Sequence, residues 1–186
     1  MKWFFSVASV LLFLLILSCA ESPSVTSSLT INNGPIRLNL VLLTNEFHSF
    51  DEINFQVVLA NQGDKSILVH SRLHHVAIPV PASISEMLIL IFDSSGNRIA
   101  REYHPNYALP SIDTLEELQP GDQVTQIFYL RTSGFFDRSL FKQGEKYTIV
   151  AIYQNDINTM KTINGIEVPS WVGSIESNRV TFTILP

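Results

Sequence analysis

Apolar and polar residues alternate along much of the chain that follows residue 35. The alternation is clearest in residues 36–42 and 53–60, where every second side chain is Ile, Leu, Val or Phe. Because successive side chains of an extended strand point to opposite faces, this pattern predicts strands with one buried face. The same signals predict further strands at residues 67–70, 87–93, 98–103, 124–131, 147–153 and 180–185.

Short polar clusters rich in Gly, Pro, Asn, Asp and Ser separate these strands. The cluster at residues 61–64, Asn-Gln-Gly-Asp, predicts a hairpin between the strands on either side of it. No long amphipathic helix is evident, and only residues 134–141 have the spacing of a helical turn. Many short strands between turn signals are typical of an all-β fold, so we predict an antiparallel β-sandwich of about seven to nine strands over residues 36–186.

The first 18 residues have a different pattern from the rest of the chain. Lys2 is followed by an almost unbroken apolar stretch at residues 3–17. This stretch is shorter than the roughly 20 residues that a membrane-spanning helix needs, and the layout is that of a signal peptide. An uncleaved helix or an ordinary signal peptide are the alternatives.

The only cysteine of the chain, Cys19, comes directly after this leader. Ile16 and Ser18 precede it in a pattern that resembles the lipobox of bacterial lipoproteins, which has a branched apolar residue and a small residue before the cysteine. The resemblance implies removal of residues 1–18 and attachment of acyl chains such as palmitate to Cys19. Lipid on Cys19 would make the membrane its first partner.

The residues after Cys19 suit a tether. Residues 20–30 are rich in Ser and Thr, so we expect residues 19–35 to form a lipidated, flexible connection to the domain. In a Gram-negative bacterium, Ala20 at the position after the cysteine implies sorting to the outer membrane, with the domain facing the periplasm. With its only thiol at Cys19, the domain has no internal disulfide and depends on packing for its stability.

The charge balance argues against one class of partner. The chain has 12 Lys and Arg residues against 17 Asp and Glu residues, a net charge of −5, and it has no run of basic residues. A polyanion would be repelled by this surface, so we expect no binding of nucleic acid.

Two landmarks carry a resemblance at the level of the fold. The turn Leu-Gln-Pro-Gly-Asp at residues 118–122 precedes one strand, and Tyr147 opens another within residues 144–151. Together they resemble the immunoglobulin-like sandwiches of secreted bacterial proteins, in which such a Tyr forms a tyrosine corner. Over residues 36–153 they are also similar to the BsuPI-like proteinase-inhibitor domains, which implies proteinase inhibition as an alternative function.

Histidines are the main candidates for metal chemistry. His70, His74 and His75 lie within six residues, and imidazoles bind zinc or copper where three converge. In an extended segment only His70 and His74 point to the same side, so a site there competes with the alternative of exposed loop histidines. The chain contains no nucleophile elbow, phosphate-binding Gly-rich loop or His-Glu-x-x-His motif, and we expect neither catalysis nor a resident cofactor.

Aromatic residues in the predicted connections are candidates for a binding surface. Phe135, Phe136 and Trp171 would form such a surface if exposed, or would seal the ends of the sandwich if buried. The connection at residues 155–171 is longer than usual, which makes it the first place to look for binding. We therefore expect a noncatalytic, lipid-anchored envelope protein that binds a protein partner or supports the envelope structure.

Overall fold

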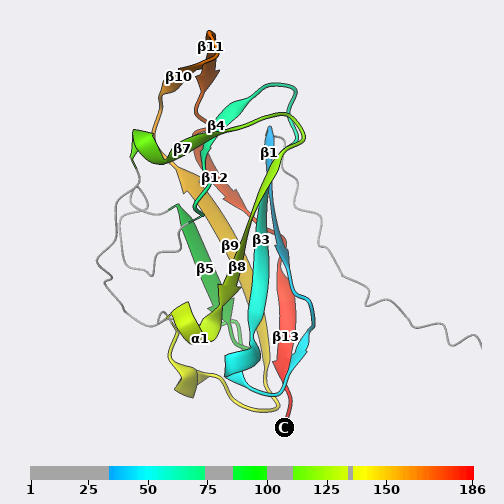
Figure 1. Ribbon diagram of the computed structural model, residues 1–186. Coiled ribbons are helices and arrows are strands. Elements are labelled where there is room, and N and C mark those ends of the chain that lie inside the picture. Colours follow the sequence, from blue (N-terminus) through cyan, green and yellow to red (C-terminus); the bar gives the residue numbers. More distant parts are fainter. Residues whose placement is uncertain (1–33, 74–85, 100–110, 134–135) are drawn as a thin grey trace, which may run out of the picture.

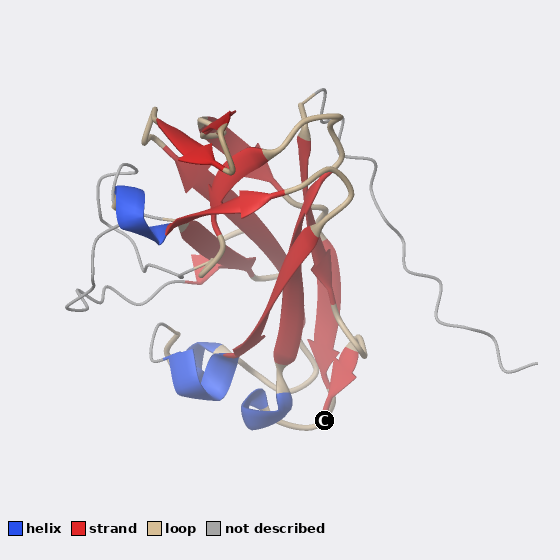
Figure 2. Ribbon diagram, turned by 45° about the horizontal axis from the view of Figure 1, so that its top comes forward, coloured by secondary structure: helices blue, strands red, loops and turns tan. Residues whose placement is uncertain are grey.

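The protein is an all-β sandwich, as the alternating pattern predicts (Figure 1). The computed structural model describes residues 34–73, 86–99, 111–133 and 136–186. Cys19 and residues 20–33 of the expected tether therefore lie outside the described residues. The helices are short pieces in the connections between strands (Figure 2): η1 (Phe50–Glu52), η3 (Ile112–Thr114), α1 (Leu130–Ser133) and η4 (Arg138–Leu140). In the part of the chain that is described, no helix has the length and apolarity to cross a membrane.

The first sheet has three antiparallel strands in the order β1-β3-β8. They are β1 (Ile36–Val41), β3 (Asn54–Asn61) and β8 (Gln123–Tyr129). Every second residue of β1 and β3 is buried, so these two strands have the half-buried form that the alternation predicts.

The second sheet is built around β9 (Lys146–Asn155), with β5 on one side and the last strands of the chain on the other. β12 pairs with the C-terminal half of β9 and β13 with its N-terminal half. Short strands complete the two edges, and the β2–β13 pair is parallel. The remaining members of this sheet are β2 (Glu46–Phe47), β5 (Met87–Phe92), β6 (Arg98–Ile99), β12 (Gly173–Glu176) and β13 (Val180–Ile184).

The main core lies between the two sheets. Chain order places β1, β3 and β8 in one layer and β5, β9 and β13 in the other, which is the strand distribution of immunoglobulin-like sandwiches. Both layers contribute fully buried side chains, including Leu38, Phe55, Met87, Ile149 and Phe182.

Tyr147 forms the tyrosine corner that its position predicts. Its ring is buried at the start of β9. Its hydroxyl accepts a hydrogen bond from the N–H of Lys142 at 2.7 Å and donates to the carbonyl oxygen of Leu140 at 3.3 Å. The hydroxyl therefore satisfies backbone groups of the preceding loop, as it does in other sandwiches with this feature.

The prediction of a hairpin around residues 61–64 is wrong. β3 pairs with β1 and β8, whereas β4 (Ile67–His70) pairs with β7 (Leu115–Leu118). Asn61 explains the difference, because its side-chain amide donates to the carbonyl oxygens of Lys65 and Leu118. These bonds hold the chain in a corner that leads into a second ladder.

Two further strands occupy the connection at residues 155–171. β10 (Met160–Ile163) and β11 (Ile166–Pro169) form an antiparallel hairpin. Its turn consists of Asn164 and Gly165, with φ of 51° and 81°. Two residues with positive φ are what a tight type I′ turn requires, so this connection is ordered by its own backbone.

Candidate functional site

One end of the sandwich carries elements beyond the two main sheets, and we call it the hairpin end. It consists of the β4–β7 ladder and the β10–β11 hairpin, and it lies opposite the C-terminus (Figure 1). A second, small core of Leu68, Leu115 and Val168 joins the ladder to the hairpin, with Ile157 and Ile163 packed against it. The hairpin is thus fastened to the domain by apolar contacts.

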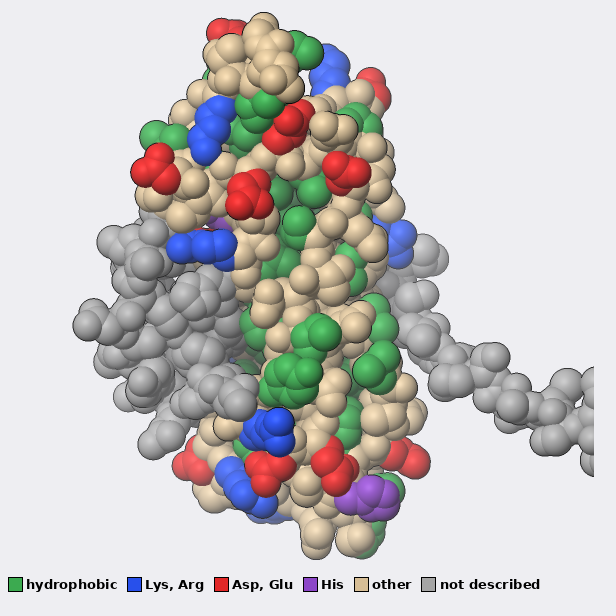
Figure 3. Space-filling model, viewed as in Figure 1, with side chains coloured by type: hydrophobic (Ala, Val, Ile, Leu, Met, Phe, Trp, Pro, Cys, Tyr) green, Lys and Arg blue, Asp and Glu red, His purple; other side chains and the backbone are tan. Residues whose placement is uncertain are grey.

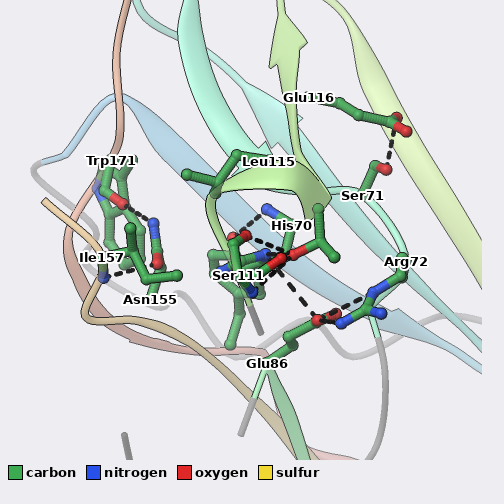
Figure 4. Close-up of polar contacts among 12 residues, drawn as sticks. His70, Ser71, Arg72, Glu86, Ser111, Leu115, Glu116, Asn155, Ile157 and Trp171 are labelled. Atoms are coloured by element: carbon green, nitrogen blue, oxygen red, sulfur yellow. Dashed lines mark hydrogen bonds and ion pairs between the residues drawn. The ribbon is translucent and has the colours of Figure 1, made fainter. Parts of the chain in front are cut away.

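His70, the last residue of β4, is the centre of a buried polar cluster at this end (Figure 4). Its Nδ1 lies 2.8 Å from the hydroxyl of Thr114. That hydroxyl donates its proton to the carbonyl oxygen of Ser111, also at 2.8 Å. Because a hydroxyl has one proton to donate, it accepts from His70, and this arrangement places the proton of the neutral imidazole on Nδ1.

An ion pair lies beside this histidine. Glu86 has 1% of its side chain exposed, and its Oε1 accepts hydrogen bonds from Nε of Arg72 at 3.0 Å and from Nη2 of the same guanidinium. The same oxygen lies 3.9 Å from Nδ1 of His70. Because the carbonyl oxygen of Glu86 also accepts from the N–H of Gln154 on β9, the pair joins the end of β4 to the second sheet.

Burial controls the charge states in the cluster. It lowers the pKa of His70, an effect opposed by the Glu86 carboxylate and the nearby Asn155 side chain and reinforced by Arg72. Burial likewise raises the pKa of Tyr153, whose hydroxyl accepts from the N–H of His70 at 2.8 Å. Both groups are therefore neutral near pH 7, and Nε2 of His70 is buried with no hydrogen-bond partner among the residues that the structure describes.

Asn155 fastens the base of the hairpin. Its amide donates to the carbonyl oxygen of Trp171 at 2.6 Å and accepts from the N–H of Ile157 at 3.0 Å. The Trp171 ring packs on Tyr153 with centroids 5.6 Å apart, and Lys161 donates to the carbonyl oxygen of Leu115 at 2.7 Å. These bonds cross both arms of the connection, so they fix the direction in which the hairpin projects.

The surface of the hairpin end exposes large apolar side chains. Met160 is 62% exposed, Ile166 is 68% exposed and Val172 is 46% exposed. Two of the three belong to the fastened hairpin, and the third follows Trp171 directly. Met160 pairs with Pro169 and Ile166 pairs with Ile163, so Met160 and Ile166 point to opposite faces of the hairpin and are separate apolar contact points at this end.

The structure separates the aromatic residues that the sequence singles out. Phe136 is buried and packs edge-on against Phe141 with centroids 6.4 Å apart, so it seals the sandwich and forms no binding surface. Trp171 is half-buried at the hairpin end. Phe135 lies outside the described residues.

His70 is not an exposed loop histidine, because it is buried within the domain. His74, its expected partner at a zinc or copper site, lies outside the described residues. Among residues 34–73, 86–99, 111–133 and 136–186, no group of three or more His, Cys, Asp or Glu side chains could hold a metal ion. The metal site at His70 and His74 stays a prediction.

Sequence reasoning missed the residues that build this end. Glu86 and Thr114 come from separate segments, and nothing in the sequence links them to His70 or to Arg72, two residues after it. The hairpin had a usable signal, because Asn164-Gly165 between apolar residues is the strongest short indication of such a turn.

Comparison with known proteins adds no relative. No protein-family model matches the chain, and a search of curated proteins finds no match either.

Proposed function

We propose that this protein is a noncatalytic, lipid-anchored component of the bacterial cell envelope whose hairpin end binds another protein. The observation that carries the proposal is the exposure of Met160, Ile166 and Val172 on an element that the fold holds in place. Burying such side chains against a partner releases roughly 25 cal/mol for each Å² of apolar surface removed from water.

The contacts that hold the hairpin in place support a role of the hairpin in binding. A flexible loop loses conformational entropy when it binds, whereas a hairpin fixed by Asn155 and by the Leu68 core has lost that entropy already. Exposed polar residues such as Asp156 and Glu167 belong to the same connection. Protein interfaces commonly contain both apolar and polar side chains.

The lipid anchor determines where the partner is found. A lipid on Cys19, with a tether that ends at residue 35, keeps the domain within reach of neighbouring envelope proteins. Proteinase inhibition is the special case in which the bound partner is a proteinase, and identification of the partner distinguishes the two functions.

A photocrosslinking amino acid in place of Ile166 tests the proposal in intact cells. The matched control is the same substitution at Leu43, which is 72% exposed and lies at the opposite end of the sandwich. We expect a discrete crosslinked protein from position 166 and none from position 43. Absence of a product at position 166, or the same products from both positions, would overturn the proposal.

A further inference from the structure

The strand orders of the two main sheets end in β1, β8, β2 and β6, and three of these four edges offer little to a new strand. β2 and β6 are two residues long in the described part of the chain, and β12, which lies off this order beside β9, is four residues long and ends in the charged Glu176. The edge of β1 is occupied at Leu40, whose N–H donates to Oδ1 of Asn178 at 2.8 Å and whose carbonyl accepts from Nδ2 at 3.0 Å. Short edges and capped edges are the usual protection against strand pairing.

β8 is the fourth edge, and its free side can be deduced from the register. The N–H of Leu130 donates to Ile53, and the N–H of Asn61 donates to Asp122, so even-numbered residues of β8 exchange their backbone bonds with β3. The N–H and C=O groups of the odd-numbered residues therefore point away from β3, and these include Gln123, Thr125 and Ile127.

No strand of the described residues lies along that side of β8. Within the described part of the chain, one hydrogen bond reaches these three backbone units, from the amide of Gln126 to the carbonyl oxygen of Ile127 at 3.3 Å. Natural edge strands are normally protected by charges, proline or bulges, and β8 has neither a charged residue nor a proline. Its side chains at positions 123, 125 and 127 are exposed.

The outer face next to this edge is also nearly free of charge. Among the outward-facing residues of β1, β3 and β8, Arg37 is the single charged side chain. On the face of the molecule in Figure 3, charged side chains gather toward the two ends, and apolar and uncharged polar groups occupy the middle.

We propose that β8 pairs with β8 of a second copy of this chain, antiparallel, about a two-fold axis at Thr125. Such an axis places Thr125 beside Thr125 of the second copy, and Gln123 beside its Ile127, with every free donor facing a free acceptor. The two three-stranded sheets become one continuous sheet of six strands.

The absence of charge on β8 favours a second copy of this chain over an unrelated strand as its partner. A two-fold axis at Thr125 brings this side chain close to its own equivalent, so a charge at this position would repel its copy. In a chain with a net charge of −5, the open edge is the uncharged one. Cross-strand Thr–Thr pairs are themselves favourable. Anchoring to one membrane, which rests on the proposed function, raises the local concentration of copies further.

Cysteine crosslinking tests the pairing in membranes of cells that make the full chain. Thr125→Cys places two thiols next to each other across the two-fold axis, and a short thiol-reactive crosslinker joins them. The matched control is Val58→Cys, because Val58 is the neighbour of Thr125 on β3 and faces the same side, one strand away from the edge. The unsubstituted chain reports any product that involves Cys19.

We expect a product of twice the chain mass from Thr125→Cys and none above background from Val58→Cys. Equal yields from the two variants, or a product with a protein of another mass, would overturn the proposal. The hairpin-end crosslink from position 166 is independent of this result, so failure of one proposal is distinguishable from failure of the other.

A charge substitution provides a second measurement on purified protein in mild detergent. Thr125→Lys puts two like charges together at the axis, whereas Thr125→Val keeps the shape without a charge. We expect sedimentation to show dimers of the unsubstituted and Val proteins and at least tenfold weaker association of the Lys protein. A monomeric unsubstituted protein, or equal association of all three, contradicts the pairing.

Discussion

The two ends of the sandwich are closed by different chemistry. Aromatic rings close the end near the C-terminus, where Tyr147 stacks on Phe182 with centroids 5.4 Å apart. Phe47 meets Phe182 edge-on at 5.7 Å, and Phe141 lies 5.1 Å from Tyr147. Closure here depends on burial of large apolar area, to which ring pairs add a smaller contribution.

Polar groups close the hairpin end. His70 and Glu86 are each 1% exposed and Asn155 is 3% exposed, yet each could be replaced in an ordinary core by an apolar residue. Buried polar groups cost free energy unless they are hydrogen-bonded, and they bond only in particular geometries. The arrangement of the strands at this end therefore depends on the geometry of these hydrogen bonds.

The difference indicates a division of tasks between the two ends. The aromatic end stabilises the fold and keeps its large rings buried or half-buried against the core. The hairpin end uses its polar cluster to position β10 and β11, and it leaves Met160 and Ile166 outside. Substitutions at the aromatic end should change stability, whereas substitutions on the hairpin should change binding.

The largest expected change in stability comes from Phe182→Ala at the aromatic end. The ring is 1% exposed and contacts both Phe47 and Tyr147, so its removal leaves a cavity. We expect the free energy of unfolding, measured with urea at neutral pH, to fall by about 3–5 kcal/mol. The neighbouring Thr183→Ala should change it by less than about 1 kcal/mol. Similar losses of unfolding free energy for the two variants would show that burial of these rings does not stabilise this end of the sandwich.

A smaller effect, dependent on pH, is expected from His70 at the hairpin end. The pKa of the buried imidazole is lowered from 6.5, so below that pH the unfolded chain binds more protons than the folded one. The contribution of neutral His70 to stability is complete above about pH 6.5 and declines as the pH falls, by at most about 1.4 kcal/mol per pH unit.

His70→Asn checks this expectation, because it retains a donor toward Thr114 and does not titrate. Urea unfolding near pH 7.5 and near pH 5.5 gives the loss of stability on acidification for each protein. We expect a smaller loss for the Asn variant than for the unsubstituted protein. An equal loss would mean that His70 does not control the acid sensitivity of this end.

The sequence predicts the sandwich well, because its core strands are governed by local rules. Alternation in β1 and β3 and the landmark Tyr147 follow directly from side-chain geometry. The prediction of a hairpin at residues 61–64 was wrong because a turn signal shows only that the chain bends. It does not show which strand the following strand pairs with. In this case Asn61 decides the partner through bonds to residues distant in sequence.

The candidate site could be predicted only in fragments. Its exposed Met160 and Ile166 lie in the connection at residues 155–171, where a binding surface is expected from loop length, and Trp171 lies at the base of the hairpin. Tyr153 on β9 is 83 residues from its partner His70 and Thr114 is 44 residues from it, and pairing over such distances depends on the complete fold. Cys19 and the lipid expected on it lie outside the described residues.

Binding at the hairpin end is tested most directly by copurification with the double variant Met160→Ser, Ile166→Ser. Leu43→Ser is the matched control, because it removes an equally exposed apolar residue at the other end. Both proteins should keep the free energy of unfolding within about 0.5 kcal/mol. We expect the envelope partner to copurify with the unsubstituted and Leu43→Ser proteins and to be lost from the double variant. A partner that still copurifies with the double variant would contradict binding at the hairpin end.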